Sequence, residues 1–146
     1  MRFLLIILLF YAPTIASAGH FYLEPYFGYV YNADASNTGY GAKIGYEKRK
    51  WAYGAEYMEV PVSTSVNSNH IGVFVHRYFR RVKFGVSYFI SNSVNGADIK
   101  ETAYKIDLGY EKYRHLSFNF GYFSFGPKTM YMFAIGFPFG DPDRDR

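Results

Sequence analysis

Residues 45–57 read GYEKRKWAYGAEY, two alternating segments joined by the basic turn Lys48-Arg49-Lys50. Residues 109–122, GYEKYRHLSFNFGY, repeat this arrangement with the same first four letters. In both stretches large apolar side chains recur at every second position, mostly with Gly, Ala, Ser, Asn or Glu between them. A period of two sends alternate side chains to opposite faces of a strand, so each stretch predicts a β-hairpin.

The same alternation covers most of the chain after residue 20. The alternating segments are 21–31, 40–47, 51–58, 70–78, 82–90, 102–111, 116–122 and 129–139. Most have the length, about nine to eleven residues, that a tilted strand needs to cross a bilayer. The pattern predicts an all-β fold, an eight-stranded antiparallel up-and-down transmembrane β-barrel. In the segment 70–78 the pattern leaves open which face is outward, and a β-bulge there would explain the ambiguity.

The connections between the segments alternate in character. Longer polar stretches, 32–38, 61–69 and 91–101, follow the first, third and fifth segments. Short basic turns follow the second, fourth and sixth. Short periplasmic turns and longer external loops are typical of outer-membrane barrels, and an even number of strands places both termini on the periplasmic side.

The N-terminus has the pattern of a targeting segment. A positive start, an apolar run and the sequence Ala16-Ser17-Ala18 predict a signal peptide over residues 1–18, with Ala16 and Ala18 at the cleavage site. A buried N-terminal helix or strand is the alternative. We expect the barrel over residues 19–139 and a charged periplasmic tail over residues 140–146.

Composition narrows the class of protein. The chain contains no Cys, which excludes disulfides and thiolate chemistry, and 22% of its residues are aromatic. Its formal net charge of +4 is a small excess, and together with the signal peptide it argues against a nucleic-acid partner. No apolar stretch after residue 18 approaches the length of a spanning helix, so the mature chain is either exported and soluble or inserted as a barrel.

One face of the strands carries the charges. The charged face contains Glu24, Lys43, Glu47, Glu56, Lys83, Lys105, Asp107 and Glu111. A soluble barrel would turn this face to water. However, the face is also rich in Gly, which suits a crowded interior, and the opposite face has more large rings than a small barrel could enclose. We therefore expect the charged residues to line the lumen and to plug it with a salt-bridge network, which disfavours a pore.

In this interpretation each GYEK is the end of a strand. The glycine gives room inside, the tyrosine points outward into an aromatic girdle, and Glu47 or Glu111 points inward toward lysines on neighbouring strands. These tyrosines are Tyr46 and Tyr110, and the girdle would also include Trp51, Tyr113 and Phe139.

The chain resembles the small eight-stranded outer-membrane barrels of Gram-negative bacteria, the OmpA/OmpX-like group. The resemblance rests on Ala16-Ser17-Ala18, the eight alternating segments, and the terminal segment from Met132 to Phe139. It implies an outer-membrane location and contact with membrane lipids and lipopolysaccharide. It also implies that the barrel-assembly machinery reads the aromatic end of the last strand, a role that Phe137 and Phe139 fit.

One pair of residues in the sequence has the spacing of a known catalytic motif. Barrel deacylases use a His-x-Ser pair and a downstream Glu, and His115-Leu116-Ser117 has the spacing of the pair. No acidic residue follows until Asp141, and His115 lies at an expected periplasmic turn, so a structural role is favoured. His70 and His76 lie too far apart along a strand to share a metal. We predict no catalytic, metal or cofactor site.

The sequence therefore predicts a non-enzymatic outer-membrane barrel with a structural or surface-interaction role. Its external loops, expected over 32–38, 61–69 and 91–101, could bind an unidentified surface ligand. Two alternatives remain open, a lipid-A-modifying enzyme of the deacylase kind and a secreted soluble barrel that binds a small apolar ligand.

Overall fold

The computed structural model describes residues 19–31, 36–63, 65–113 and 115–140. The expected signal peptide, with Ala16 and Ala18, and all but the first residue of the expected tail lie outside these described residues. Within the described segments, no helix is long and apolar enough to span a membrane.

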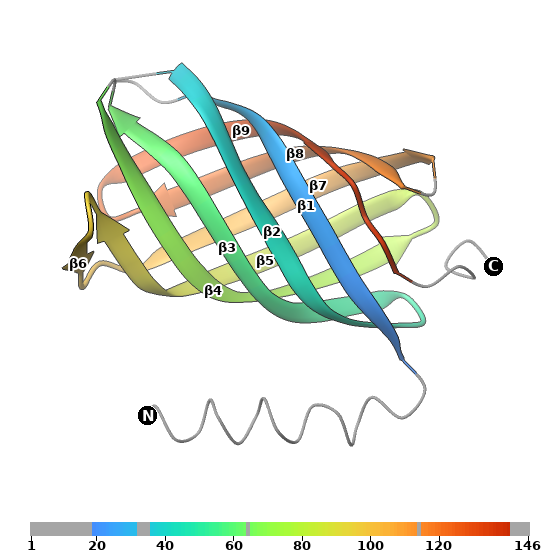
Figure 1. The fold of residues 1–146 in the computed structure, drawn as a ribbon. Helices are drawn as coiled ribbons and strands as arrows, with labels where there is room; N and C mark the ends of the chain where they lie inside the picture. Colours follow the sequence, from blue (N-terminus) through green and yellow to red (C-terminus); the bar gives the residue numbers. More distant parts are fainter. Residues whose placement is uncertain (1–18, 32–35, 64, 114, 141–146) are drawn as a thin grey trace, which may run out of the picture.

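The described residues form one closed antiparallel wall (Figure 1). Its strands are β1 His20–Tyr31, β2 Ser36–Lys48, β3 Trp51–Ser63, β4 Val66–Phe79, β5 Val82–Val94, β7 Ala103–Tyr113, β8 Leu116–Phe125 and β9 Lys128–Gly136. The pairing runs β4-β3-β2-β1-β9-β8-β7-β5, and a further pairing between β4 and β5 closes the ring. The eight-stranded up-and-down barrel is thus confirmed. A short ninth strand, β6 Ala97–Ile99, pairs with the end of β5 beyond the point where β7 leaves it.

The two ends of the barrel differ. At one end, here called the turn end, two-residue basic turns join β2 to β3 and β4 to β5, and Arg49 and Arg80 begin them with positive φ values of 56° and 58°. Both ends of the described chain lie at the turn end, because Leu23 and Phe139 exchange two backbone hydrogen bonds of 2.8 and 2.7 Å. The opposite end, which carries β6, is called the loop end.

The expected external loops are much shorter than the sequence suggested. Residues 61–69 mostly continue β3 and β4, residues 91–94 continue β5, and residues 36–38 begin β2. Ser and Asn favour turns when read locally. Here they pair with neighbouring strands, and Ser68 and Asn92 are buried inside the wall. Residues 32–35 lie outside the described part of the chain.

The facing of β4 is settled by the structure. Ile71, Val73 and Val75 are exposed on the outer wall, and the residues between them are buried. A register shift does occur here, but the extra residue lies in the neighbouring strand. Ile71 pairs with Ser91 and Gly72 pairs with Phe89, which leaves Ile90 as a bulge in β5.

The first GYEK glycine lies at a point of close contact. Gly45 faces Gly54 across the β2–β3 ladder. A Cβ atom on Gly45 would lie 2.1 Å from the carbonyl oxygen of Tyr53 and 2.7 Å from Cα of Gly54. Gly121 is less restricted, because its Cβ would come no closer than 3.2 Å to a side-chain atom of Asp107.

We therefore predict that Gly45→Ala lowers the free energy of unfolding by about 2–3 kcal/mol, because the neighbouring backbone must move. The matched change Gly121→Ala should cost less than about 1 kcal/mol, because only a side chain must adjust. Urea unfolding in phospholipid vesicles, followed by the fluorescence of Trp51, measures both. Equal destabilisation by the two changes would contradict the close contact at Gly45.

Candidate functional site

The middle of the lumen holds a compact set of charges. It consists of Glu24 from β1, Lys43 from β2, Glu56 from β3, Lys83 from β5, and Lys105 and Asp107 from β7. None of these residues is more than 3% exposed. The alternation of each strand turns them inward, and barrel closure brings residues from distant parts of the chain to one level. We call these six residues the charge network.

Lys43 lies at the centre of the network. Its Nζ is 3.1 Å from Oδ2 of Asp107, 3.8 Å from Oε2 of Glu24 and 4.0 Å from Oε1 of Glu56. One ammonium group thus contacts the three carboxylates of the network, which come from three different strands. Such contacts compensate part of the cost of removing the ions from water.

The other two lysines pair with carboxylates that Lys43 also contacts. Lys83 donates to Oε1 of Glu24 at 2.5 Å, and Lys105 forms an ion pair with Glu56. Nζ of Lys105 also lies 3.5 Å from Oδ2 of Asp107. Three carboxylates and three ammonium groups balance one another, so the network as a whole needs no counterion.

Hydroxyl groups complete the coordination of the carboxylates. Tyr22 donates to Glu24 at 2.6 Å, and Tyr26 donates to Glu56 at 2.5 Å. Ser117 also donates to Glu24, at 2.9 Å. Buried charges are tolerated only when such hydrogen bonds satisfy them.

The glutamates of the two GYEK copies, Glu47 and Glu111, lie nearer the turn end than the charge network. Glu47 is fully buried and Glu111 is 7% exposed, while the preceding Tyr110 lies on the outer wall. The backbone N–H of Glu111 donates to the carbonyl of Arg81 at 2.8 Å, which holds the β4–β5 turn against β7. The remaining two residues of the predicted lumen set therefore also lie inside the barrel.

An apolar cluster closes the lumen at each side of the charge network. The turn-end cluster consists of Tyr22, Ala52, Phe74 and Tyr78. The loop-end cluster consists of Tyr26, Val30, Met58, Val60, Val62, Phe89, Ala103, Phe123, Phe125, Met130, Met132 and Ala134. These clusters bury the network from both sides.

A buried histidine, which the sequence pattern offered only as a possible metal ligand, lies within the loop-end cluster. His70 is fully buried, with Nδ1 2.7 Å from Oδ1 of Asn92 and Nε2 2.7 Å from Oγ of Ser68. Its ring packs edge-on against Phe123 and Phe125, at centroid distances of 4.8 and 4.9 Å. The only sequence signal was its place on the inward face of β4, and that facing was open.

The lumen has almost no free space. The cavity between Tyr26, Lys43, Lys105 and Asp107 has a volume of about 10 Å³. A single water needs at least that much. This cavity, at the level of the charge network, therefore has no room for a continuous column of water.

The residues considered for chemistry do not come together. His115 is exposed, and its Nδ1 lies 3.1 Å from the carbonyl oxygen of Pro138, whereas Ser117 is buried and bonds to Glu24. The two side chains thus point to opposite faces of the wall. His76 lies 3.5 Å from Asp107, in a different layer from His70. Across the described segments, no three His or carboxylate groups gather as a metal site would require.

The last strand ends earlier than expected, at Gly136. Pro138 has no N–H for the ladder, yet the chain continues beside β1. Phe137 donates to Pro25 at 2.9 Å, and Phe139 bridges Leu23. Both candidate assembly residues are thus held at the seam between β1 and the C-terminal segment.

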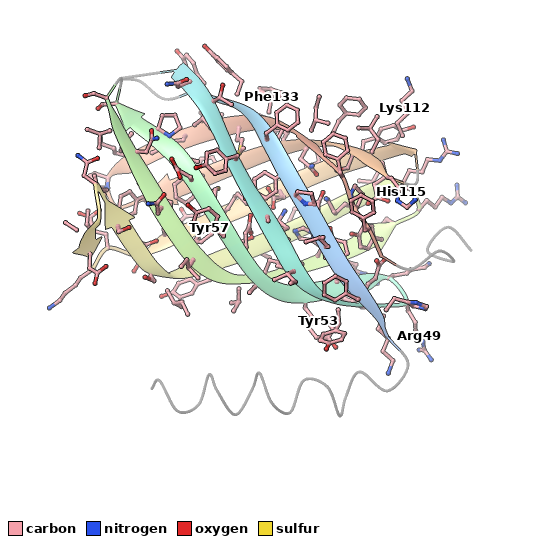
Figure 2. The ribbon with its side chains drawn as sticks, in the orientation of Figure 1. Arg49, Tyr53, Tyr57, Lys112, His115 and Phe133 are labelled. Carbon is pink, nitrogen blue, oxygen red and sulfur yellow. The ribbon has the colours of Figure 1, made fainter. Side chains whose placement is uncertain are left out.

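The outer wall is the reverse of the lumen. Exposed rings and branched aliphatic side chains cover every strand, including Phe27, Trp51, Val73, Phe84, Leu108, Phe118 and Phe133. In Figure 2, Tyr53 and Phe133 lie on the outer wall, and Arg49, Lys112 and His115 lie at the turn end.

An outward carboxylate lies on this apolar wall toward its loop end. Glu59 lies toward the loop end of β3 and accepts hydrogen bonds from Tyr40 at 2.5 Å, Tyr57 at 3.2 Å and Asn67 at 2.9 Å. At the turn end, Arg77 lies over the ring of Trp51 at 5.1 Å. Such amphipathic pairs are typical of membrane–water interfaces.

Known structures share the fold. The backbone structure of the Yersinia pestis outer membrane protein Ail in a phospholipid bilayer nanodisc matches with a TM-score of 0.58 and 12% identity, over 83% of this chain and 99% of that one. The de novo designed TMB2.3 matches with a TM-score of 0.53 and 11% identity, over 83% and 96%. Neisserial surface protein A matches with a TM-score of 0.48 and 15% identity, over 84% and 96%.

No protein-family model matches the sequence, and a search of curated proteins found no match. The structural matches have low identity and therefore bear on the fold. The matches with TM-scores above 0.5 confirm that the chain has the fold of the small eight-stranded outer-membrane barrels, as the resemblance in sequence implied.

The charge network makes a prediction for stability. Glu56→Gln should lower the free energy of unfolding by about 3–5 kcal/mol, because it leaves the three buried ammonium groups of the network with only two carboxylates. The double change Glu56→Leu with Lys105→Met should cost much less than Glu56→Gln, since it removes both charges. Unfolding in phospholipid vesicles measures all variants.

Glu59→Gln is the matched control, because it makes the same chemical change three residues along the same strand, on the outer wall. We expect it to cost less than about 1 kcal/mol. A Glu56→Gln barrel as stable as the wild type would contradict the role of the network.

Proposed function

We propose that the protein is an integral outer-membrane β-barrel without enzymatic activity, which serves a structural or surface-interaction role. The observation that carries this proposal is the inverted distribution of side chains. Eight charged residues are buried in the lumen, while large apolar side chains such as Phe133, 64% exposed, cover the outside.

This distribution requires an apolar surrounding. Soluble monomers rarely expose continuous apolar patches larger than a few hundred square ångströms. Here the apolar side chains encircle the wall, and rings such as Phe27 and Phe133 are 50% and 64% exposed. Closure of the sheet gives each of the eight long strands a hydrogen-bonding neighbour on both sides, which is the condition for a β-structure in lipid. The soluble ligand-binding barrel is disfavoured for the same reason, because its apolar face would be turned to water.

The packing of side chains in the lumen supports a closed barrel and argues against an open channel. The charge network crosses the interior at mid-height, and the turn-end and loop-end clusters cover it on both sides. The role of the eight lumen charges is then structural, since they hold opposite sides of the wall together.

A surface role would fall mainly to the β5–β6 hairpin, which extends beyond the wall at the loop end (Figure 1). Its tip contains Asn95 and Gly96, both with positive φ, followed by exposed Ala97 and Asp98. We propose this hairpin as the place where an external ligand or partner would bind, in place of the longer loops expected from the sequence.

The deacylase alternative is not favoured by the geometry. His115 and Ser117 point to opposite faces, and Ser117 is held by Glu24 inside the lumen. A nucleophile and its general base must lie within hydrogen-bond reach of each other.

Biogenesis completes the proposal. Residues 1–18 would direct export and be removed after Ala18, and the barrel-assembly machinery would read Phe137 and Phe139. The surrounding partners would be phospholipids and lipopolysaccharide.

The first test is of location and folding. We expect the protein in the outer-membrane fraction, with a band that shifts on heating in a gel run in sodium dodecyl sulfate, because a closed barrel resists the detergent until it is heated. Recovery in the soluble fraction without a shift would refute the proposal. Mass spectrometry of lipid A from cells with and without the gene should show no change in acyl chains, and an acyl-chain change that depends on Ser117 would favour the deacylase.

The second test is of conduction. Purified barrel in a planar lipid bilayer should show no stable single-channel conductance, because the lumen has no continuous water path. A variant that removes the loop-end rings, Phe123→Ala with Phe125→Ala, should still show none, because the charge network remains below. Ohmic conductance of the wild type would contradict the closed lumen.

A further inference from the structure

An apolar trough runs obliquely across the outer wall over β5, β7, β8 and β9. It encloses about 430 Å³, a volume within the range of small-molecule sites. Its two sides are rows of laterally paired outward residues, Tyr110, Phe118 and Ile135 nearer the turn end, and Leu108, Phe120 and Phe133 nearer the loop end. The inward-facing row between them presents its backbone as the floor.

The trough ends beside a group of cations. Its last lining residue, Val82, directly follows Arg80-Arg81 in the β4–β5 turn, and both arginines are exposed. Lys112, also exposed, follows two residues after Tyr110. The hydrogen bond from the N–H of Glu111 to the carbonyl of Arg81, 2.8 Å long, holds this turn against β7. Figure 2 shows Lys112 at the turn end and Phe133 on the outer wall.

We propose that this trough binds an anionic glycerophospholipid of the leaflet at the turn end. An acyl chain would lie between the two rows of apolar side chains, and the phosphate would lie against Arg81 and Lys112. Arg forms bidentate hydrogen bonds with phosphate, and basic groups beside apolar wall surfaces bind anionic headgroups. The proposal rests on the membrane insertion proposed above.

Charge complementarity decides the class of lipid. A zwitterionic headgroup would bring an ammonium group of its own toward the cluster of Arg80, Arg81 and Lys112, whereas phosphatidylglycerol brings a phosphate without one. Lipopolysaccharide also carries phosphates, but the basic turns lie at the end where the termini meet, which the proposed topology places in the periplasm. The source is therefore the inner leaflet.

The experiment is native mass spectrometry of the full barrel in detergent, titrated with phosphatidylglycerol, with phosphatidylethanolamine or with lipid A. The wild type should retain one phosphatidylglycerol in preference to phosphatidylethanolamine. The double change Arg80→Gln with Arg81→Gln should weaken this retention roughly 10- to 30-fold, since each basic residue near a membrane surface contributes about a factor of five.

The control is Arg49→Gln with Lys50→Gln. It removes the same charge from a two-residue turn whose first residue also has positive φ, but between β2 and β3, away from the trough. We expect retention within about threefold of the wild type, because general attraction to an anionic lipid is the only effect lost.

A second pair of variants tests the trough without changing charge. Val82→Phe places a ring in the end of the trough and should also weaken retention, whereas Val75→Phe, an equivalent outward change on β4, should not. Both positions are on the outer wall, so the barrel should still fold and give its heat-shifted band.

Four results would overturn the inference. They are equal retention of the two phospholipids, equal losses for the two turn variants, preferential retention of lipid A over phosphatidylglycerol, and a stable dimer that forms without lipid and is broken by Val82→Phe. A protein that gives no heat-shifted band would instead refute the proposed function. The two failures are therefore distinguishable.

Discussion

The requirement that every backbone group be hydrogen-bonded within the wall shapes the rest of this structure. In an apolar surrounding an open strand edge would leave a row of N–H and C=O groups without partners, at a cost of several kcal/mol each. Closure between β4 and β5 and between β1 and β9 removes both edges. Even the C-terminal segment after Gly136 stays paired with β1 despite two prolines at the seam, Pro25 and Pro138.

Closure of the barrel imposes a second constraint, because it makes the interior narrow. Every second residue of eight strands must fit inside, which explains the glycine pair Gly45 and Gly54 and the absence of room beside the charge network. Lys43 contacts carboxylates from β1, β3 and β7, so strands far apart around the wall are held by one ammonium group. The apolar clusters on either side exclude water and so strengthen these contacts.

Much of this arrangement could be predicted from alternation alone. The number of strands, their order and the inward face of Glu24, Lys43 and Lys105 follow from a period of two. The ends of the strands could not be predicted so well. Ser68 and Asn92 resemble loop residues in sequence, yet they lie inside the wall as partners of His70. Asn92 bonds to His70 on the neighbouring strand β4, and the hydroxyl of Ser68 donates to the carbonyl of Val60 on β3. A local pattern does not contain these partners.

The sequence by itself determined the strand period, the inverted placement of charged and aromatic side chains, and the basic turns, because each depends on residues close together in the chain. Only the tertiary structure decided which charges meet, where the bulge at Ile90 lies, and that the side chains of His115 and Ser117 separate. It also decided that a trough opens beside Arg81. These features depend on the register between strands, which closure of the whole barrel sets and no single segment specifies.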